Sequence, residues 1–364
     1  MTAVSNRSPA RRRLLLASDR LDQSSELADI LATVGDVGTV PISEIPETPA
    51  GKFSGIVVDI NLRSPENVQS VRSKLVKQSY QSIPRLFVIA GGMHHGSMQA
   101  WALGATDTIE RPLDAQAILQ RIRAAFPDGN DFDGSSRGQT LNKAVTAAHL
   151  VMVKIFERLP AGVPLSLDDV AKAETKILRA IAHTSLREWL TIVGRHHNLS
   201  YRHCLFVTGF VVAFAQHLGM REDDQRRLAR AALLHDVGKA FIPLAILNKP
   251  GELTEEEMNE VRRHPRQGYD ALAAQGGFPP EMLDVVLHHH ELLDGSGYPN
   301  GLTASRISDI VRIITIADIH AALVEKRPYR EPYTPMQAFA MMEEMGDKLD
   351  QQLLQAFRPV VLGG

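Results

Sequence analysis

The stretch HHHELLDGSGYP, residues 288–299, decides how the C-terminal half of this sequence is interpreted. Three consecutive histidines and two carboxylates place many metal-ligating groups on one short segment, since imidazole is the commonest neutral ligand and carboxylates suit harder metals. The glycines that follow let the backbone pass close to a ligand, and Pro299 pushes Tyr298 towards an extended conformation. The stretch therefore predicts a metal cluster beside a substrate-facing loop.

Further metal-ligating residues are distributed over the same half of the chain. His203 lies in a segment with helical spacing of apolar residues, His235 and Asp236 end another, and His264 precedes a proline at an expected helix boundary. Asp318 lies within an apolar helix, where an unpartnered buried carboxylate would be costly. Helices that point His and Asp side chains inward can build a two-metal site.

Each of these residues also has an ordinary structural explanation. A single His203 or His264 is commonly a surface residue or a hydrogen-bonded one. His235 would be favoured at a helix C-terminus by the helix dipole, although Asp236 beside it would not be. The joint pattern is more specific than any of its parts.

The helical half follows a predicted linker. Residues 127–139 are rich in Gly, Asp and Ser, which is typical of a linker. Residues 140–195 predict connecting helices over Leu141–Leu159 and Leu167–Val193, and residues 196–364 predict a helical bundle. The connecting helices could pair between two chains and give a homodimer, or they could cap the bundle. The spacing of their apolar residues agrees with both.

The N-terminal segment, residues 1–126, alternates strand and helix signals and predicts a doubly wound α/β domain. The expected strands are Arg13–Ala17, Ile56–Ile60, Leu86–Ala90 and Thr106–Ile109. The expected helices are Leu21–Ala32, Val68–Lys77, Ser97–Leu103 and Asp114–Ala125.

Length, charge and cysteine content indicate which kinds of protein this sequence can encode. A length of 364 residues suits two domains, and a net charge of −2 gives no reason to expect a nucleic-acid polymer as partner. The single cysteine, Cys204, excludes disulfides and fits a reducing cytoplasm. The apolar run after Arg13 is too short for an export signal, and no run approaches the ~20 apolar residues of a membrane span. We therefore expect a cytoplasmic protein without a membrane anchor.

The motifs of the C-terminal half follow one another in the order of a known family signature. The sequence HDVGK at residues 235–239, His264-Pro265, and HHE followed by DGSGYP within residues 289–299 resemble the signature of HD-GYP domains. These are helical phosphodiesterases of the HD superfamily that hydrolyse cyclic di-GMP to pGpG or GMP in bacterial second-messenger signalling. The resemblance extends over residues 196–350.

The resemblance implies the roles of individual residues. Asp236 would bridge two metals and act in catalysis with Lys239, and cyclic di-GMP would be the substrate. The implied metal ligands are His203, His235, Asp236, His264, His289, His290 and Asp318. The implied substrate-binding residues are Lys239, Gly297, Tyr298, Pro299, Arg327 and Arg330.

Departures from the family pattern refine these expectations. Some members carry a glutamate four residues before the first histidine ligand, which supports a third metal, whereas this chain has Leu199. We therefore expect two divalent ions, and His/Asp ligands without thiolate favour iron or manganese. Leu292 and Ala321 stand where the family often has basic and acidic residues. An alternative function therefore stays open, that of a cyclic di-GMP sensor or protein-interaction module with weak or no turnover.

The α/β half resembles a response-regulator receiver over residues 12–126. Asp59 stands where a receiver has its phosphoacceptor, and Asp19 stands near the acidic Mg²⁺ pocket, where receivers usually have two acids. Ala90 takes the place of the switch Ser/Thr, and Arg111 that of the usual lysine. The resemblance implies a histidine kinase or another signalling protein as partner. A degenerate domain used for docking or dimerisation is the alternative.

Overall fold

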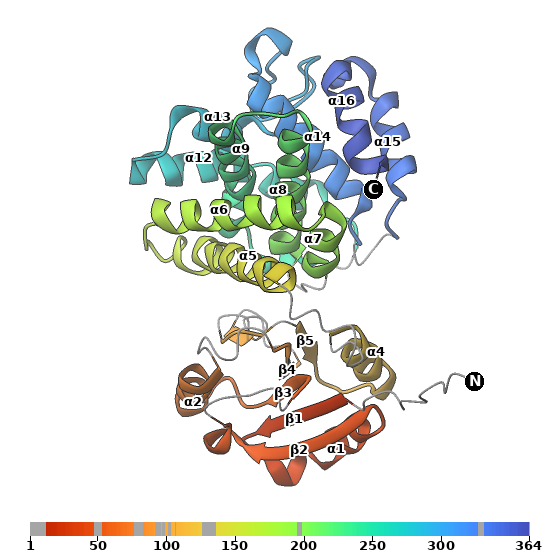
Figure 1. The fold of residues 1–364 in the computed structure, drawn as a ribbon. Helices are drawn as coiled ribbons and strands as arrows, with labels where there is room; N and C mark the ends of the chain where they lie inside the picture. Colours follow the sequence, from red (N-terminus) through yellow and green to blue (C-terminus); the bar gives the residue numbers. More distant parts are fainter. Residues whose placement is uncertain are drawn as a thin grey trace, which may run out of the picture. The chain divides into compact units, whose positions relative to one another are not determined.

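The chain divides into two compact units, Met1–Thr146 and Ala147–Gly364 (Figure 1). The structure is a computed structural model. It describes residues 12–46, 53–75, 83–91, 96, 99–100, 103–105, 107–125, 136–194, 199–249, 251–326 and 331–363. Among these residues, no helix is both long and apolar enough to cross a membrane.

The N-terminal unit is built on a five-stranded parallel sheet with the strand order β2-β1-β3-β4-β5. This is the order of the flavodoxin-like doubly wound fold, so the expected α/β receiver-like class is confirmed. The strands are β1 (Arg12–Ser18), β2 (Gly35–Pro41), β3 (Gly55–Asp59), β4 (Arg85–Ile89) and β5 (Asp107–Glu110). The helices are α1 (Ser25–Ala32), α2 (Pro65–Leu75) and α4 (Ala115–Ala125).

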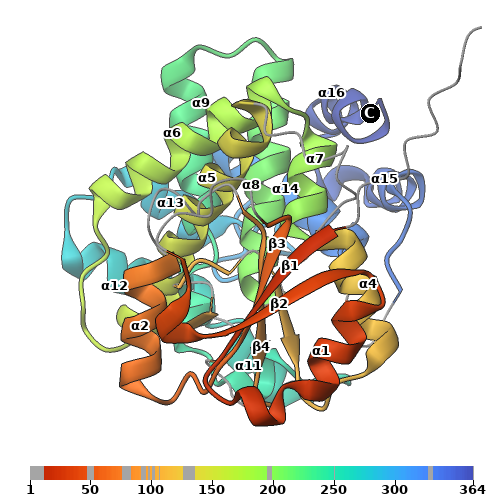
Figure 2. The same cartoon turned by 60° about the horizontal axis from the view of Figure 1, so that its bottom comes forward.

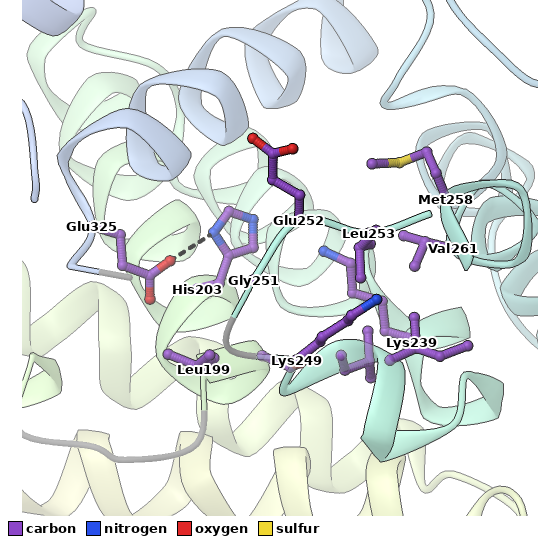
Figure 3. Close-up of a pocket in the computed structure, with 13 residues that line it drawn as sticks. Leu199, His203, Lys239, Lys249, Gly251, Glu252, Leu253, Met258, Val261 and Glu325 are labelled. Atoms are coloured by element: carbon purple, nitrogen blue, oxygen red, sulfur yellow. Dashed lines mark ion pairs between the residues drawn. The ribbon is translucent and has the colours of Figure 1, made fainter. Parts of the chain in front are cut away.

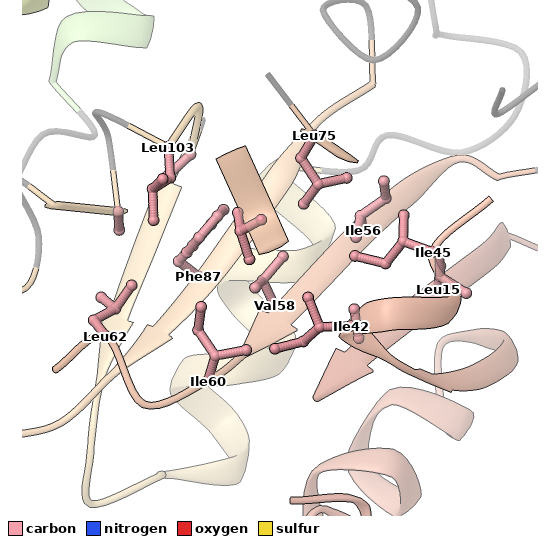
Figure 4. Close-up of a cluster of buried hydrophobic side chains, with 14 of the residues drawn as sticks. Leu15, Ile42, Ile45, Ile56, Val58, Ile60, Leu62, Leu75, Phe87 and Leu103 are labelled. Carbon is pink, nitrogen blue, oxygen red and sulfur yellow. The ribbon is translucent and has the colours of Figure 1, made fainter. Parts of the chain in front are cut away.

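Alternating side chains along the buried strands build a hydrophobic core on each face of the sheet. One core joins Leu15, Val58 and Phe87 to Leu75 of α2 (Figure 4). The other core packs α1 and α4 against the opposite face, and the two views of the ribbon show these helices together on that side (Figure 2). Because both faces are covered, the strands could be recognised as nearly continuous apolar runs.

Strand β2 was not expected from the sequence. Its residues are mostly half-buried or exposed, it contains Gly35 and Gly38, and it lies at one edge of the sheet beside β1. An edge strand of this kind lacks the apolar run that marks the buried strands. Most of the expected helix Ser97–Leu103 lies outside the described residues.

The C-terminal unit is a bundle of helices around α8 (Leu199–His217), whose side chains are almost all buried from Tyr201 to Ala215. The expected all-α bundle is confirmed. The surrounding helices are α6 (Leu167–His183), α7 (Leu186–Val193), α9 (Glu222–Leu234), α10 (Leu244–Leu247), α11 (Glu255–Val261), α12 (His264–Gln275), α13 (Pro280–His288), α14 (Asp309–Val324), α15 (Pro335–Glu344) and α16 (Gln351–Leu362).

Of the predicted connecting helices, the first crosses the boundary between the two units, and the second is part of the helical bundle. Helix α5 (Ser136–Val153) begins inside the segment expected to be a linker, of which residues 127–135 lie outside the described residues. The second predicted helix is two helices, because Ser185 caps the start of α7. Trp189 of α7 is fully buried, and its indole Nε1 donates to the Leu205 carbonyl of α8 at 2.9 Å. Packing on the bundle thus explains the apolar spacing of α6 and α7, and a homodimer through these helices stays a prediction.

Candidate metal centre

The candidate ligands come from five helices that converge in the C-terminal unit. His203 lies in α8 and Asp318 in α14, both within the helix body. His235 is the C-cap residue of α9, His289 is that of α13, and His264 is the first residue of α12. Residues far apart in the sequence therefore meet because three helix ends point at the bodies of two other helices.

A glycine allows two of these elements to approach closely. The short 3-10 helix η5 (Val237–Phe241) follows Asp236 and packs on α12. A Cβ atom at Gly238 would lie 1.8 Å from the His264 carbonyl oxygen and 2.7 Å from the Gly268 nitrogen. Only glycine fits there, so the HDVGK motif needs its glycine to bring Asp236 next to His264.

Asp236 lies at the centre of the site and presents its two oxygens to different imidazoles. Its Oδ1 is 3.1 Å from His264 Nε2 and 3.6 Å from His289 Nε2. Its Oδ2 is 3.4 Å from His235 Nε2 and 3.7 Å from His203 Nε2. The ligand atoms form two sets, each close enough together to hold a metal ion. One set is Asp236 with His264, His289 and His290, and the other is Asp236 with His203 and His235.

Asp318 joins the two sets. Its Oδ1 is 2.7 Å from His203 Nε2 and 3.9 Å from His235 Nε2, and its Oδ2 is 3.5 Å from His290 Nδ1. A second carboxylate therefore faces both sets from the opposite helix, α14. The predicted ligands all lie together, and His290 is the most exposed of them, with 22% of its side chain accessible.

Backbone carbonyls orient three of the imidazoles. The Nδ1–H groups of His235 and His264 donate to the carbonyls of Ala232 and Val261 at 2.7 and 2.6 Å. His289 Nδ1 lies 3.1 Å from the Val286 carbonyl. These bonds fix the tautomer, because a protonated Nδ1 leaves the Nε2 lone pair directed into the cluster.

The electrostatics suit cation binding. Burial lowers the pKa of His289 to about 4 and that of His290 well below its usual range. Burial alone would raise the pKa of Asp236, but Lys239 and the neighbouring imidazoles hold it well below its usual value. Neutral His289 and His290 beside an ionised Asp236 are protonation states that a metal requires. Burial alone would lower the pKa of His203 as well, but its hydrogen bonds to Asp318 and Glu325 raise this pKa to about 9.

The residues present fit a metal. Among the described residues, the buried His235 Nε2 and Asp236 Oδ1 have no hydrogen-bond partner. A buried polar atom without a partner costs about 1–3 kcal/mol, which a bound cation would relieve. Buried His/Asp clusters with such atoms are consistent with a metal site, as the sequence predicts.

The loop after α13 places Tyr298 against this cluster. The Tyr298 ring stacks on His290, with ring centroids 4.7 Å apart. Both oxygens of the buried Glu291 accept backbone N–H groups of the loop, from Asn300 at 2.6 Å and Leu302 at 2.8 Å. His288 turns away and bonds Asp284 instead. The loop is thus held by Glu291, and Tyr298 packs on a candidate ligand.

A cavity of about 470 Å³ opens beside the cluster (Figure 3). Its charged lining residues are His203, Lys239, Lys249, Glu252 and Glu325. Its apolar lining residues include Leu199, Ile246, Leu247, Leu253, Met258 and Val261. The Lys239 ammonium lies 2.6 Å from Asp236 Oδ2, so a cation stands between the cluster and the cavity.

Arg327 and Arg330 lie outside the described residues. Gly297 and Pro299 belong to the loop of Tyr298, where a Cβ at Gly297 would lie 2.3 Å from the Leu292 nitrogen. Glu325 was not expected at the site, because neither its spacing nor its neighbours in the sequence single it out.

The receiver-like unit has its own acidic position. Asp59 ends β3 and is buried, and its Oδ2 accepts from the Arg111 guanidinium at 2.8 Å and the Ser24 hydroxyl at 3.3 Å. Asp19 accepts instead from the Asn61 backbone at 3.0 Å. The carboxylate of Asp59 is therefore already paired with a cation of its own unit.

The helical fold and its His/Asp centre define an HD domain, and the family profile described as HD domain matches residues 176–353. The cyclic di-GMP phosphodiesterase PA4108 of Pseudomonas aeruginosa is 32% identical over an alignment of 279 residues, and the match covers 67% of this chain and 67% of the relative. The chain belongs to the family of HD-domain cyclic di-GMP phosphodiesterases, and its other domain is receiver-like.

Two other relatives match different parts of the chain. The cyclic di-GMP phosphodiesterase response regulator RpfG of Xanthomonas campestris pv. campestris is 29% identical over 304 residues, which are 83% of this chain and 74% of its own. The 3'3'-cGAMP-specific phosphodiesterase 3 of Vibrio cholerae is 43% identical over 130 residues, 36% of this chain and 28% of its own.

Proposed function

We propose that this protein hydrolyses the phosphodiester bonds of cyclic di-GMP, giving pGpG, GMP or both, with two divalent ions, iron or manganese, in the metal centre. The observation that carries this proposal is the position of Asp236, whose two oxygens face two different sets of imidazoles. One carboxylate shared by two sets is the arrangement needed to hold a pair of ions, which activates water and polarises phosphoryl oxygens.

The chain's own groups have separate tasks in this proposal. Lys239 lines the cavity, where its ammonium would neutralise a non-bridging oxygen of the scissile phosphate. Burial alone would lower the pKa of Lys239, but Asp236 and Asp318 raise it, so this cation stays protonated. The apolar side of the cavity offers a dry surface for a nucleobase, and Tyr298 orients His290 by stacking.

An anaerobic assay with metal analysis on the same sample tests the proposal. The wild-type protein is expected to contain two ions per chain and to convert cyclic di-GMP. Asp236→Ala should lose both metal and turnover while its helicity persists. The control is Asp223→Ala, an exposed residue of the preceding helix α9 that should change neither. Turnover by metal-free Asp236→Ala, or three tightly bound ions in the wild type, would contradict the proposal.

A second substrate is supported by one comparison. The identity of 43% to the 3'3'-cGAMP-specific enzyme is higher than that to either cyclic di-GMP relative, although it extends over 130 residues only. Side-by-side assays with both dinucleotides distinguish the two activities. Binding of cyclic di-GMP to metal-loaded protein without any turnover would instead favour the sensor module that Leu292 and Ala321 leave open. Ala321 itself is fully buried.

For the receiver-like unit we propose a docking role without phosphotransfer. The Arg111–Asp59 ion pair and the engagement of Asp19 by Asn61 support this proposal, because a phosphoacceptor needs Mg²⁺ beside its carboxylate. Incubation with labelled acetyl phosphate should leave the protein unlabelled. Labelling that is lost in Asp59→Asn would identify Asp59 as a phosphoacceptor and overturn this proposal.

A further inference from the structure

Glu325 is a buried carboxylate that lies directly behind one of the candidate ligands. It is the C-cap residue of α14, it is 2% exposed, and its Oε2 is 3.4 Å from His203 Nδ1 (Figure 3). Asp318, seven positions earlier in the sequence, contacts the other nitrogen of the same ring, Nε2, at 2.7 Å. Seven residues are about two helical turns, so both carboxylates come from one side of α14.

His203 therefore differs from three other imidazoles of the cluster. Nδ1 of His235, His264 and His289 faces backbone carbonyls, at 2.7, 2.6 and 3.1 Å. His203 is the fifth residue of α8, and its Nδ1 lies 3.4 Å from a carboxylate oxygen of Glu325 instead. A carboxylate behind a ligating imidazole fixes the tautomer and makes the other nitrogen more basic.

The orientation of Glu325 is set by a neighbour of the ligand. Arg202 precedes His203 on α8, is 9% exposed, and donates from Nε to Glu325 Oε1 at 2.7 Å. Its Nη2 donates to the Lys326 carbonyl. Arg202 thus ties the end of α14 to α8 and turns Oε2 of Glu325 towards the His203 ring.

We propose that Glu325 is a positioning residue for the metal centre, which accepts the Nδ1–H of His203 and so presents the Nε2 lone pair of that ring to a metal. This inference rests on the metal-binding part of the proposed function and does not depend on turnover. It assigns to α14 both a ligand, Asp318, and the support of a second ligand.

Manganese affinity of the full-length protein, measured by competition with a chelator, tests the inference. Glu325→Gln keeps the volume of the side chain and an oxygen for Arg202, and it should weaken binding of Mn²⁺ by roughly 10–100-fold. Glu325→Asp keeps the charge and should lose less. The matched control is Glu174→Gln, since Glu174 is equally buried and bonded to Arg230 in α9, and its affinity should stay within twofold of the wild type.

The outcomes separate this inference from the proposed function. No binding of Mn²⁺ by the wild type would contradict the metal centre itself. Equal affinity of the wild type and Glu325→Gln, with or without a lower melting temperature of the metal-free protein, would leave the centre intact and overturn the role of Glu325. If Glu325→Gln does not fold, the Mn²⁺ affinity of Glu325→Asp is measured instead. Its shorter side chain cannot reach His203 in the same way, so an affinity equal to that of the wild type would also overturn the role of Glu325.

Discussion

Glu291 shows how one side chain can hold the loop that carries Tyr298. Glu291→Ala would leave the backbone N–H groups of Asn300 and Leu302 without their acceptor. We expect the free energy of unfolding to fall by about 2–3 kcal/mol in urea titrations, since each lost partner of a buried donor costs about 1–3 kcal/mol. Asp294→Ala is the control, because Asp294 is exposed and, among the described residues, its carboxylate accepts from Ser296 alone. Equal losses in both variants would contradict this account.

His320 is a buried histidine outside the set of ligands. Its ring contacts those of Phe210 and Phe357, at centroid distances of 4.8 and 5.5 Å, and burial lowers its pKa to about 4. Between pH 6.5 and 4 the unfolded chain binds a proton here that the folded chain does not. The titration of His320 therefore leaves the free energy of unfolding unchanged above pH 6.5. As the pH falls below 6.5, it lowers the free energy of unfolding by up to about 3 kcal/mol.

The measurement for His320 is the free energy of unfolding at several pH values. In His320→Phe the fall between pH 6.5 and 4 should be less steep than in the wild type by up to about 1.4 kcal/mol per pH unit. An aromatic ring is kept, so packing against Phe210 and Phe357 is preserved. Identical slopes would show that the imidazole titrates freely in the folded protein.

Single residues of the centre could be predicted because their chemistry stands out in an apolar context. His235, Asp236 and Asp318 are costly to bury without a use, and the structure brings them together. Glu325 could not be found in this way, because it follows the end of a helix beside Lys326 and looks like a surface residue. Its role depends on contacts with α8, more than a hundred positions away.

At the scale of helices and strands, the close contact of η5 with α12 leaves no room for a side chain at Gly238. Gly238→Ala would drive a Cβ atom to 1.8 Å from the His264 carbonyl oxygen, and neither backbone can yield without moving a ligand. We expect a loss of about 3 kcal/mol or more in the free energy of unfolding, with loss of bound metal. Gly251→Ala is the control, since no atom lies within 4 Å of the added Cβ. Unchanged stability of Gly238→Ala would refute the tight contact.

Helices and strands could be predicted from the sequence where burial of one or both of their faces leaves a regular pattern of apolar residues. Strands β3 and β4 are buried throughout and were recognised, whereas β2 at the sheet edge was not. The break between α6 and α7 was overlooked because apolar residues continue through it, although Ser185 marks a helix start. Periodicity reports a buried face, and a cap is needed to show where a helix ends.

At the scale of the whole molecule, the described residues form two units with buried apolar side chains in each, and the metal centre found among them lies in the helical unit. Scanning calorimetry should therefore show that removal of metal by a chelator lowers the melting temperature of the helical unit alone. A metal at 100 times its dissociation constant stabilises by about 2.7 kcal/mol, which corresponds to roughly 5–10 °C for a unit of this size. Asp236→Ala protein should not respond to the chelator. A shift of the transition of the α/β unit would contradict this independence.

The indole of Trp189 gives this molecule an optical reporter. It is shielded from water, its nitrogen is bonded to Leu205, and its ring edge lies so close to Gly209 that an added Cβ would be 2.4 Å away. Leu205 is two positions from His203 on the same helix. Since the chain has two tryptophans, replacement of Trp101 by phenylalanine leaves Trp189 as the single tryptophan. The fluorescence of that single ring would follow any displacement of α8, without an added label.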